Sequence, residues 1–349
     1  MFRLRDVVRA AIMAAMVMAA CAGAVSANVF NMGNGLTSLE FVTVDNPGNA
    51  GELSGGGAGG YGANRICGAV DYTFGMGKYE VTAGQYTEFL NAVAKTDTYG
   101  LYSTSMRIQR TGSPGTYAYT VVPDSANLPV NLVSWGDAAR FANWLTNDQP
   151  MGAQNASTTE DGSYYLDGAM TDAALIAVQR KPNARYVIPT EDEWYKAAYH
   201  KNDGITGNYF NYASSSDSVP SNDLVNPDPG NNANFYQDGG STRDSPSKLT
   251  PVGEFENSES PYGTFDQTGN VWEWNEAIIV YSDPHRGLRG GSFDGDEYFQ
   301  RAALRSDDEP MDQTSNDGFR VAAVPEPTSM VLLALAGVGM LMGRREPSR

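Results

Sequence analysis

Oxygen donors gather in one short segment of this chain, residues 266–274, which reads Asp-Gln-Thr-Gly-Asn-Val-Trp-Glu-Trp. Asp266 and Glu273 supply two carboxylates, and a turn at Gly269 can present backbone carbonyls between them. Hard oxygen donors of this kind suit a calcium ion. On a strand, the two tryptophans would share one face and Glu273 would point to the other. The spacing therefore leaves two interpretations open, a calcium loop and a hairpin with an aromatic face.

Three helix starts precede this segment. Each is a Ser or Thr followed three residues later by a side chain that can reach back to its backbone, which is the pattern of a capping box. Apolar residues recur after each start with helical spacing. The pattern predicts helices that begin at Thr82, Ser134 and Thr190.

The remaining regular structure is expected to be short. Runs of β-forming residues occur at residues 39–44, 72–81, 117–122, 186–188 and 318–323. Residues 146–183 and 201–250 are polar connections with little periodicity, and loops of that length are usually functional or tied by a metal. These features predict an α+β fold with long loops, as one domain over residues 36–324.

The N-terminus has the pattern of an export signal. A basic start is followed by an apolar run, and Val25-Ser-Ala27 fits a small-residue cleavage site. We therefore predict a signal peptide over residues 1–27. A lipoprotein, acylated at Cys21, is the alternative.

The C-terminus carries Pro325-Glu-Pro327, an apolar run over residues 330–342, and then arginines. This run covers about 20 Å as a helix at about 1.5 Å per residue, less than the ~30 Å of a hydrocarbon core. Residues 325–349 resemble the PEP-CTERM sorting signal of exported bacterial proteins. The resemblance implies an exosortase-type partner, removal of the tail, and a place at the cell surface, outer envelope or extracellular matrix. A plain tail anchor is the alternative.

Charge and cysteine content limit the partners of this chain and the possible sources of its rigidity. The formal net charge is −17, which disfavours nucleic acid as a partner and favours cations. Cys67 is the one cysteine left after signal removal, so an intramolecular disulfide is excluded. Because an exported domain without disulfides needs another source of rigidity, bound metal is a candidate.

An ordered series of motifs resembles the sulfatase-modifying factor domain, the family of the formylglycine-generating enzyme. The motifs span nearly the whole mature chain and include 78–82, 129–135, 186–194, 269–274, 289–293, 301–305 and 318–320. The resemblance implies a C-type-lectin-like fold with calcium sites. It also implies an oxidase that converts a sulfatase cysteine to formylglycine with O2, copper(I) and a cysteine pair.

The catalytic part of that resemblance fails in this chain. In the family the cysteine pair follows the Gly-Gly-Ser motif, but residues 292–301 contain no cysteine. Carboxylates there are hard ligands and do not replace thiolates for copper(I), so copper is not expected. A second branch of the family binds iron through histidines. The two histidines here, His200 and His285, are expected to be unpaired surface residues.

Calcium is the cofactor that the resemblance does imply. One family site matches Asp266, the carbonyls of Gly269 and Val271, and Glu273. A second family site matches four groups in the 201–250 connection, namely Asn234, the Phe235 carbonyl, Asp244 and the Pro246 carbonyl. An acidic, solvated loop cluster is the alternative for both.

Arginines cluster in the last third of the chain, where the catalytic relatives have their peptide groove. Arg289, Ser292, Arg301 and Arg305 are the candidate lining of a ligand cleft. The competing interpretation is that Arg289, Arg301, Arg305 and Arg320 pair with carboxylates inside an irregular core, for which the planar guanidinium is suited.

Two functions follow from these patterns. The favoured one is a non-catalytic, calcium-stabilised binding or matrix-associated protein that takes extracellular polysaccharide or a peptide or protein ligand. Its candidate sugar-stacking residues, which also fit a core, are Trp135, Trp194, Trp272 and Trp274. The alternative is a diverged protein-modifying oxidoreductase. It would need a replacement metal centre, drawn from Asp294, Asp296, Glu297 and His285.

Overall fold

Three of the α-helices begin at the predicted capping boxes. The computed structural model describes residues 30–31, 38–243, 247–280 and 282–325. The helices α2 (Ala83–Val93), α3 (Trp135–Thr146) and α5 (Glu191–Tyr199) follow Thr82, Ser134 and Thr190. In each, the cap side chain and the side chain three residues later accept hydrogen bonds from each other's backbone N–H, which confirms the prediction.

A fourth helix, α4 (Asp172–Ala177), lies in the 146–183 connection and was not predicted. It is six residues long, and Leu175 is its buried residue. Because so short a helix shows no repeated apolar stripe, the periodicity that revealed the other three is missing here.

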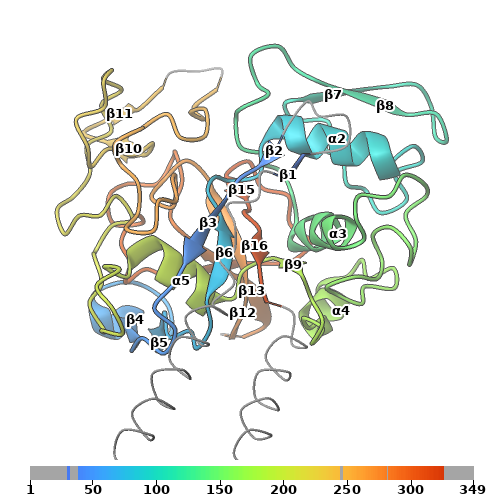
Figure 1. The fold of residues 1–349 in the computed structure, drawn as a ribbon. Helices are drawn as coiled ribbons and strands as arrows, with labels where there is room; N and C mark the ends of the chain where they lie inside the picture. The colour runs from blue at the N-terminus through green and yellow to red at the C-terminus, as the bar shows by residue number, and fades with distance from the viewer. Residues whose placement is uncertain (1–29, 32–37, 244–246, 281, 326–349) are drawn as a thin grey trace, which may run out of the picture.

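The central sheet joins the beginning and the end of the described chain (Figure 1). Its order is β3 (Phe41–Val44), β6 (Phe74–Gly77), β16 (Ala322–Ala323) and β9 (Tyr186–Val187), with neighbours antiparallel. Met76 lies opposite both Val42 and Ala322. Segments more than 200 residues apart in sequence thus become adjacent.

The second sheet is built on the tryptophan segment. Its order is β14 (Ser306–Asp308), β13 (Pro284–Arg289), β12 (Trp272–Val280) and β15 (Asp317–Gly318), and β15 is parallel to β12. The hairpin interpretation of the tryptophan segment is therefore confirmed. Both faces of its first residues are buried, because Trp272, Glu273 and Trp274 are all inaccessible to solvent or nearly so.

The other strands form four two-stranded sheets, and a 3-10 turn, η1, covers Gly56–Ala58. The pairs are β1 (Phe30–Asn31) with β2 (Ser38–Leu39), β4 (Glu52–Ser54) with β5 (Arg65–Cys67), β7 (Ile108–Thr111) with β8 (Ala118–Val121), and β10 (Tyr236–Gln237) with β11 (Gly240–Ser241). All five predicted β runs contain strands. The fold is α+β, with long loops around short elements.

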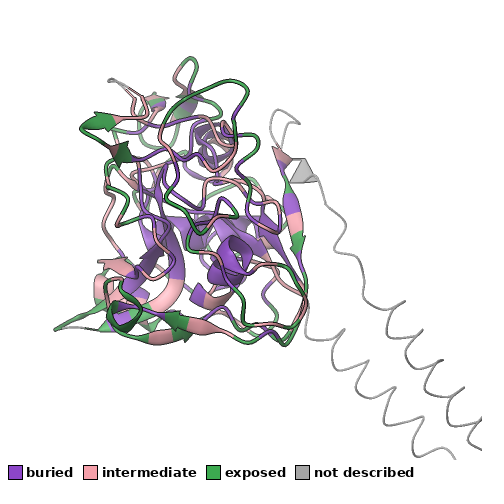
Figure 2. Cartoon of the chain, turned by 90° about the vertical axis from the view of Figure 1, so that its left-hand side faces the viewer, coloured by how far each residue is buried: buried purple, intermediate pink, exposed green. Residues whose placement is uncertain are grey.

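Aromatic rings from α2, α3 and the C-terminal segment fill the main core. Tyr86 and Phe89 of α2 meet Phe141 and Trp144 of α3, and Phe319 closes the cluster, with ring centroids 5.3–6.5 Å apart. Tilted and edge-on contacts of this kind are favourable for aromatic pairs. Figure 2 shows the buried interior around these helices and the central strands.

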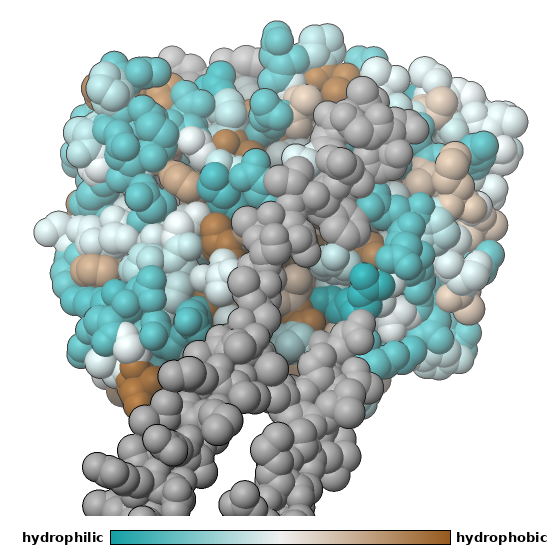
Figure 3. All heavy atoms as spheres, viewed as in Figure 1, coloured by the Kyte–Doolittle hydropathy of each residue, from teal (hydrophilic) through white to brown (hydrophobic). Residues whose placement is uncertain are grey.

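The outer surface is mostly polar. Hydrophilic residues predominate over the face in Figure 3, and apolar residues occur there in small separate groups. Among the residues that the structure describes, no helix has both the length and the apolar character needed to cross a bilayer.

Candidate functional site

Glu273, a predicted calcium ligand, is occupied by protein partners. Arg320 Nε donates to its Oε2 at 2.6 Å, and an Nη group donates to its Oε1 at 2.7 Å. Trp194 Nε1 also donates to Oε2 at 2.8 Å. Both residues of the ion pair are fully buried. Each oxygen of Glu273 therefore already has a strong donor, and the carboxylate is fixed inside the core.

Asp266 is the more available carboxylate of this first predicted site. Its Oδ2 accepts a hydrogen bond from the Gly253 backbone N–H at 2.7 Å. Burial raises the pKa of Asp266 to about 6, and Glu273 adds to the rise, whereas Gly253 and Arg320 oppose it. Burial and the nearby charge of Asp266 also raise the pKa of Glu80 well above its ordinary value. The carboxylates of Glu80, Asp266 and Glu273 thus lie near one positive charge, that of Arg320. A bound cation would compensate for the excess of negative charge.

The Gly269 turn, which carries the predicted backbone ligands, lies directly against the second predicted site. Gly269 has a φ of 82°, and a Cβ there would lie 2.2 Å from the Asn234 carbonyl oxygen, so this position requires glycine. Asn270 N–H donates to that same carbonyl at 2.8 Å. Val271 N–H donates to Glu80 at 3.3 Å. The two loops that carry the predicted metal sites are therefore in direct contact.

The second predicted site shows an unsatisfied oxygen. Asn234 is buried, and its Nδ2 donates to the Lys248 carbonyl at 2.9 Å and to Asn270 Oδ1 at 3.0 Å. Its Oδ1 is buried and accepts no hydrogen bond from the described residues. Such an orphaned acceptor fits a cation ligand. The Phe235 carbonyl accepts from Asn222 Nδ2 at 3.1 Å. Asp244 and Pro246 lie outside the described residues.

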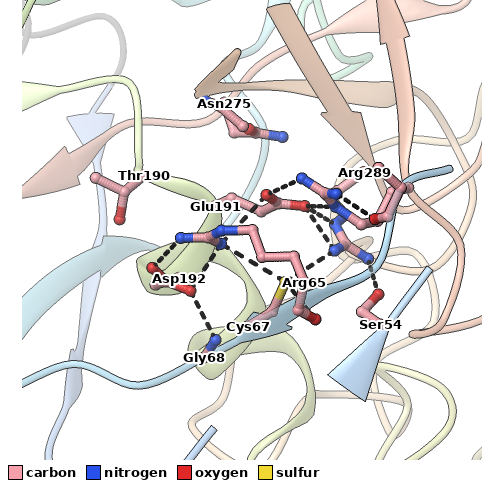
Figure 4. Close-up of polar contacts among 12 residues, drawn as sticks. Ser54, Arg65, Cys67, Gly68, Thr190, Glu191, Asp192, Asn275 and Arg289 are labelled. Carbon is pink, nitrogen blue, oxygen red and sulfur yellow. Dashed lines mark hydrogen bonds and ion pairs between the residues drawn. The ribbon is translucent and has the colours of Figure 1, made fainter. Parts of the chain in front are cut away.

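Three arginines, of which Arg289 and Arg305 are buried, converge on Glu191, the first residue of α5 (Figure 4). Arg305 forms a bidentate pair with it at 2.7 and 2.8 Å. Arg289 donates to Glu191 Oε1 at 2.6 and 3.0 Å, and Arg65 donates to Oε2 at 3.2 Å. Although burial opposes ionisation, these arginines lower the pKa of Glu191 to about 2. The cluster joins β5, α5 and β13.

Cys67 lies beside this cluster rather than in a reactive site. Its sulfur accepts a hydrogen bond from Arg289 Nη2 at 3.3 Å and is fully buried. Burial raises the pKa of the Cys67 thiol, although Arg289 opposes the rise. This environment is that of a buried structural thiol.

The four residues of the predicted ligand cleft do not line a common surface. Arg289 and Arg305 are buried in the Glu191 cluster. Ser292 is also buried, and its hydroxyl donates to Asp294 at 2.6 Å. Arg301 lies on the surface, 3.7 Å from a Glu297 oxygen. For Arg289, Arg305 and Arg320 the competing interpretation, pairing inside the core, is the one that the geometry supports.

The expectation of a surface position was wrong for His200, whereas His285 is partly exposed. His200 is fully buried, and its ring nitrogens bond the Tyr262 hydroxyl at 2.7 Å and the Thr206 carbonyl at 3.2 Å. His285 lies on β13, not in a turn, and its Nδ1 pairs with Asp307 at 2.7 Å. In the described part of the chain, no group of three or more His, Cys, Asp or Glu side chains could hold a metal ion. The replacement metal centre suggested for Asp294, Asp296, Glu297 and His285 is therefore not formed in the described structure.

The tryptophans are core residues. Trp135, Trp194 and Trp274 are fully buried, and Trp272 is 8% exposed. The indole N–H groups of Trp135, Trp194 and Trp274 donate to internal acceptors, for example from Trp274 to the Val133 carbonyl at 2.9 Å. None of the four offers a free face for a sugar.

The sequence did not reveal that Arg65 and Glu191 belong to one ion-pair cluster. Glu191 was visible only as part of a helix start, and its three arginine partners are 126, 98 and 114 residues away. No local pattern marks such pairs. The signal that could have found them is an excess of arginines in an otherwise acidic chain.

Comparisons with known proteins identify the family to which this sequence is similar. The description "Sulfatase-modifying factor enzyme 1-like domain" matches residues 66–324, and "PEP-CTERM protein-sorting motif" matches residues 323–346. The chain is 30% identical over 146 residues to "Inactive C-alpha-formylglycine-generating enzyme 2" of Bos taurus. That match covers 39% of this chain and 43% of the relative, so the chain spans less than half of the relative's length.

One solved structure resembles this chain at the level of the fold. Treponema denticola variable protein 1 superimposes with a TM-score of 0.53 at 19% identity, over 85% of this chain and 99% of that one. PvdO from Pseudomonas aeruginosa gives a TM-score of 0.47 at 18% identity, over 86% of this chain and 98% of that one. The architecture is of the C-type-lectin-like kind found in formylglycine-generating enzymes. With its core motifs assembled as described, the chain belongs to the sulfatase-modifying factor enzyme 1-like domain family and carries a PEP-CTERM protein-sorting motif.

Proposed function

We propose that this protein is an exported, non-catalytic binding domain of its family, displayed at the cell surface, in the outer envelope or in the extracellular matrix. The observation that carries the proposal is its thiol content. The chain has two cysteines, and Cys21 precedes the family-matched residues 66–324. Cys67 is buried beside Arg289. A copper(I) centre of two thiolates therefore lacks its ligands within the domain.

The curated relative supports a non-catalytic role. The Bos taurus relative is named as inactive, and this chain shares 30% identity with part of it. In the position of the family's cysteine pair, Ser292 instead bonds Asp294, and Gln300 Nε2 donates to the Ser292 carbonyl. These hydrogen bonds hold the segment closed on itself.

The sorting motif supports the location and one partner. A PEP-CTERM motif at residues 323–346 implies an exosortase-type sorting system. The acidic surface disfavours nucleic acid. The ligand we propose is an extracellular polysaccharide, and a peptide or protein ligand is the alternative.

Calcium is proposed as a structural cofactor. Two observations support it. Asn234 Oδ1 is buried and accepts no hydrogen bond from the described residues, and burial raises the pKa values of Asp266 and of neighbouring Glu80. Asn234 with the Phe235 carbonyl would hold one ion, and Asp266 with the Gly269 and Val271 carbonyls would hold another. Glu273 fits less well as a direct ligand because Arg320 occupies both of its oxygens. A bound ion would supply charge neutralisation and loop order.

The alternative is a diverged protein-modifying oxidoreductase, and one experiment separates the two. The purified protein is incubated with a sulfatase-type cysteine peptide, copper and O2, beside an active formylglycine-generating enzyme as positive control. Mass spectrometry then looks for conversion of the peptide cysteine to an aldehyde. We expect none, and formylglycine formed above the protein-free background would refute a non-catalytic role.

A further inference from the structure

A large open cavity lies in the 201–250 connection, and its lining residue Asn222 contacts Phe235 of the second proposed calcium site. Its volume is about 640 Å³, and residues 219–224, 237–238 and 240–242 line it. Ligand pockets are commonly about 300–1,000 Å³, so the cavity has room for one or two sugar-sized groups. The length of this connection had already indicated a functional loop.

The cavity walls are cross-linked before any ligand binds. Asn222 Nδ2 donates to the Phe235 carbonyl at 3.1 Å and to the Gly240 carbonyl at 3.0 Å. Asn222 N–H in turn donates to Gln237 Oε1 at 3.2 Å. One asparagine thus fixes the 219–224 wall against the β10–β11 hairpin. A preformed site of this kind reduces the entropy cost of binding.

The hairpin tip presents Asp238 rigidly. Asp238 and Gly239 are the two loop residues between β10 and β11, with φ values of 52° and 85°. Two positive φ values with an Asp-Gly sequence are typical of the tight type I′ hairpin turn. Asp238 therefore projects from a defined backbone position at the edge of the cavity.

The groups that line the cavity are both polar and aliphatic. In the described structure, the carboxylates of Asp223 and Asp238 form no ion pair and accept no hydrogen bond, and Gln237 uses only its oxygen. Beside them, Val219 is 37% exposed and Leu224 is 48% exposed. Free carboxylate oxygens and an amide N–H group thus stand next to small apolar surfaces.

We propose that this cavity binds a neutral, hydroxyl-rich carbohydrate. Sugar hydroxyls donate to carboxylates and accept from amides, and hydrogen bonds to a charged group are stronger than those between neutral groups. The C–H faces of a sugar ring match the aliphatic side chains. Two unpaired carboxylates repel uronates and sulfated glycans, so charge selects neutral polymers. This inference rests on the proposed binding function and names the ligand class and the site.

The test uses the purified protein and a panel of soluble glycans. Dextran, mannan and a β-glucan serve as neutral probes, and alginate and polygalacturonate serve as anionic probes, in affinity electrophoresis and calorimetry. We expect binding to a neutral glycan, weakened about tenfold or more by Asp223→Ala and by Asp238→Gly, the loss of roughly one good hydrogen bond. Glycine tolerates the positive φ of residue 238, so the turn is preserved.

Tyr236→Ser is the matched control. Tyr236 is 39% exposed and adjoins Gln237 on β10, so its side chain points to the opposite face of the hairpin. Its substitution should leave glycan affinity unchanged, and melting temperatures of all variants verify folding. If a glycan binds equally well to both Asp variants, the cavity assignment falls while the binding function stands. Preference for anionic polymers, or no binding to any glycan, also overturns the inference, and peptide binding then tests the proposed function separately.

Discussion

Arg320 and Glu273 form a fully buried, bidentate ion pair, with N–O distances of 2.6 and 2.7 Å. Arg320 also donates to the Gly77 carbonyl at 2.9 Å and to the Phe265 carbonyl at 2.7 Å. The pair therefore ties the C-terminal Gly-Phe-Arg segment to the tryptophan strand and to the central sheet. A residue that looked like a metal ligand in the sequence is a structural anchor in the fold.

The first prediction concerns this pair. Glu273→Gln should lower the free energy of unfolding by about 3–5 kcal/mol, because it removes the directly bonded counter-charge of a buried guanidinium and leaves only the more distant carboxylates of Glu80 and Asp266 nearby. Urea denaturation monitored by tryptophan fluorescence gives the value. The double variant Glu273→Gln/Arg320→Met should lose less stability than the sum of the two single variants, because the two residues are directly coupled. Additive losses would contradict a specific pair.

The second prediction concerns acid stability and Glu191. Its pKa is about 2 in the folded state against an ordinary value of 4.5, so the unfolded chain binds the proton more readily. Its contribution, about 3 kcal/mol, is complete above pH 4.5 and is lost as the pH falls toward 2. Glu191→Gln should flatten the stability curve over this interval. The surface variant Glu297→Gln, taken from a 3.7 Å pair that is about half exposed, should leave the slope as it is.

Asp317 carries the third prediction, with the opposite sign. Burial raises its pKa to about 7, neighbouring Asp308 adds to the rise, and its Oδ2 has no partner among the described residues. Because the folded state holds this proton more tightly, stability should fall as the pH rises from about 4 to 7. Asp317→Asn should remove that loss and stabilise the protein at pH 8 by up to about 4 kcal/mol. Exposed Asp283→Asn is the control, and equal effects of the two variants would refute the assignment.

Calcium binding is the fourth prediction. Calcium should raise the melting temperature in a concentration-dependent way, since an ion that binds only the folded state adds RT ln(1 + [Ca]/Kd), or about 2.7 kcal/mol at a hundredfold excess over Kd. Asn234→Ala and Asp266→Asn should each reduce this increase, and the double variant should reduce it further. Magnesium at equal ionic strength controls for screening. An unchanged melting temperature across the calcium titration of the wild type would remove both proposed sites.

Local patterns in the sequence were sufficient for α2, α3 and α5 and for the four strands of the central sheet. The capping boxes at Thr82, Ser134 and Thr190 involve hydrogen bonds that reach only three residues along the chain. Their energetics are therefore contained within a short window. The family motifs likewise predicted the fold class, because they recur in a fixed order.

The role of each polar residue was decided only in three dimensions. His200 and the four candidate tryptophans are buried, and their partners include residues far away in sequence, such as Tyr262 for His200 and Glu273 for Trp194. The same is true of Arg289 and Arg305, which read as a ligand cleft but meet at Glu191 across 98 and 114 residues.

The amino-acid sequence by itself determined the family, the sorting tail and the absence of a cysteine pair, because each of these depends only on residue identity and order. Tertiary structure alone decided which carboxylates are free. Glu273 and Glu191 are neutralised by arginines from remote strands and loops, whereas Asp223 and Asp238 remain open beside a cavity. The physical reason is that a carboxylate's function depends on its counter-charge and its access to solvent, and the folded chain sets both.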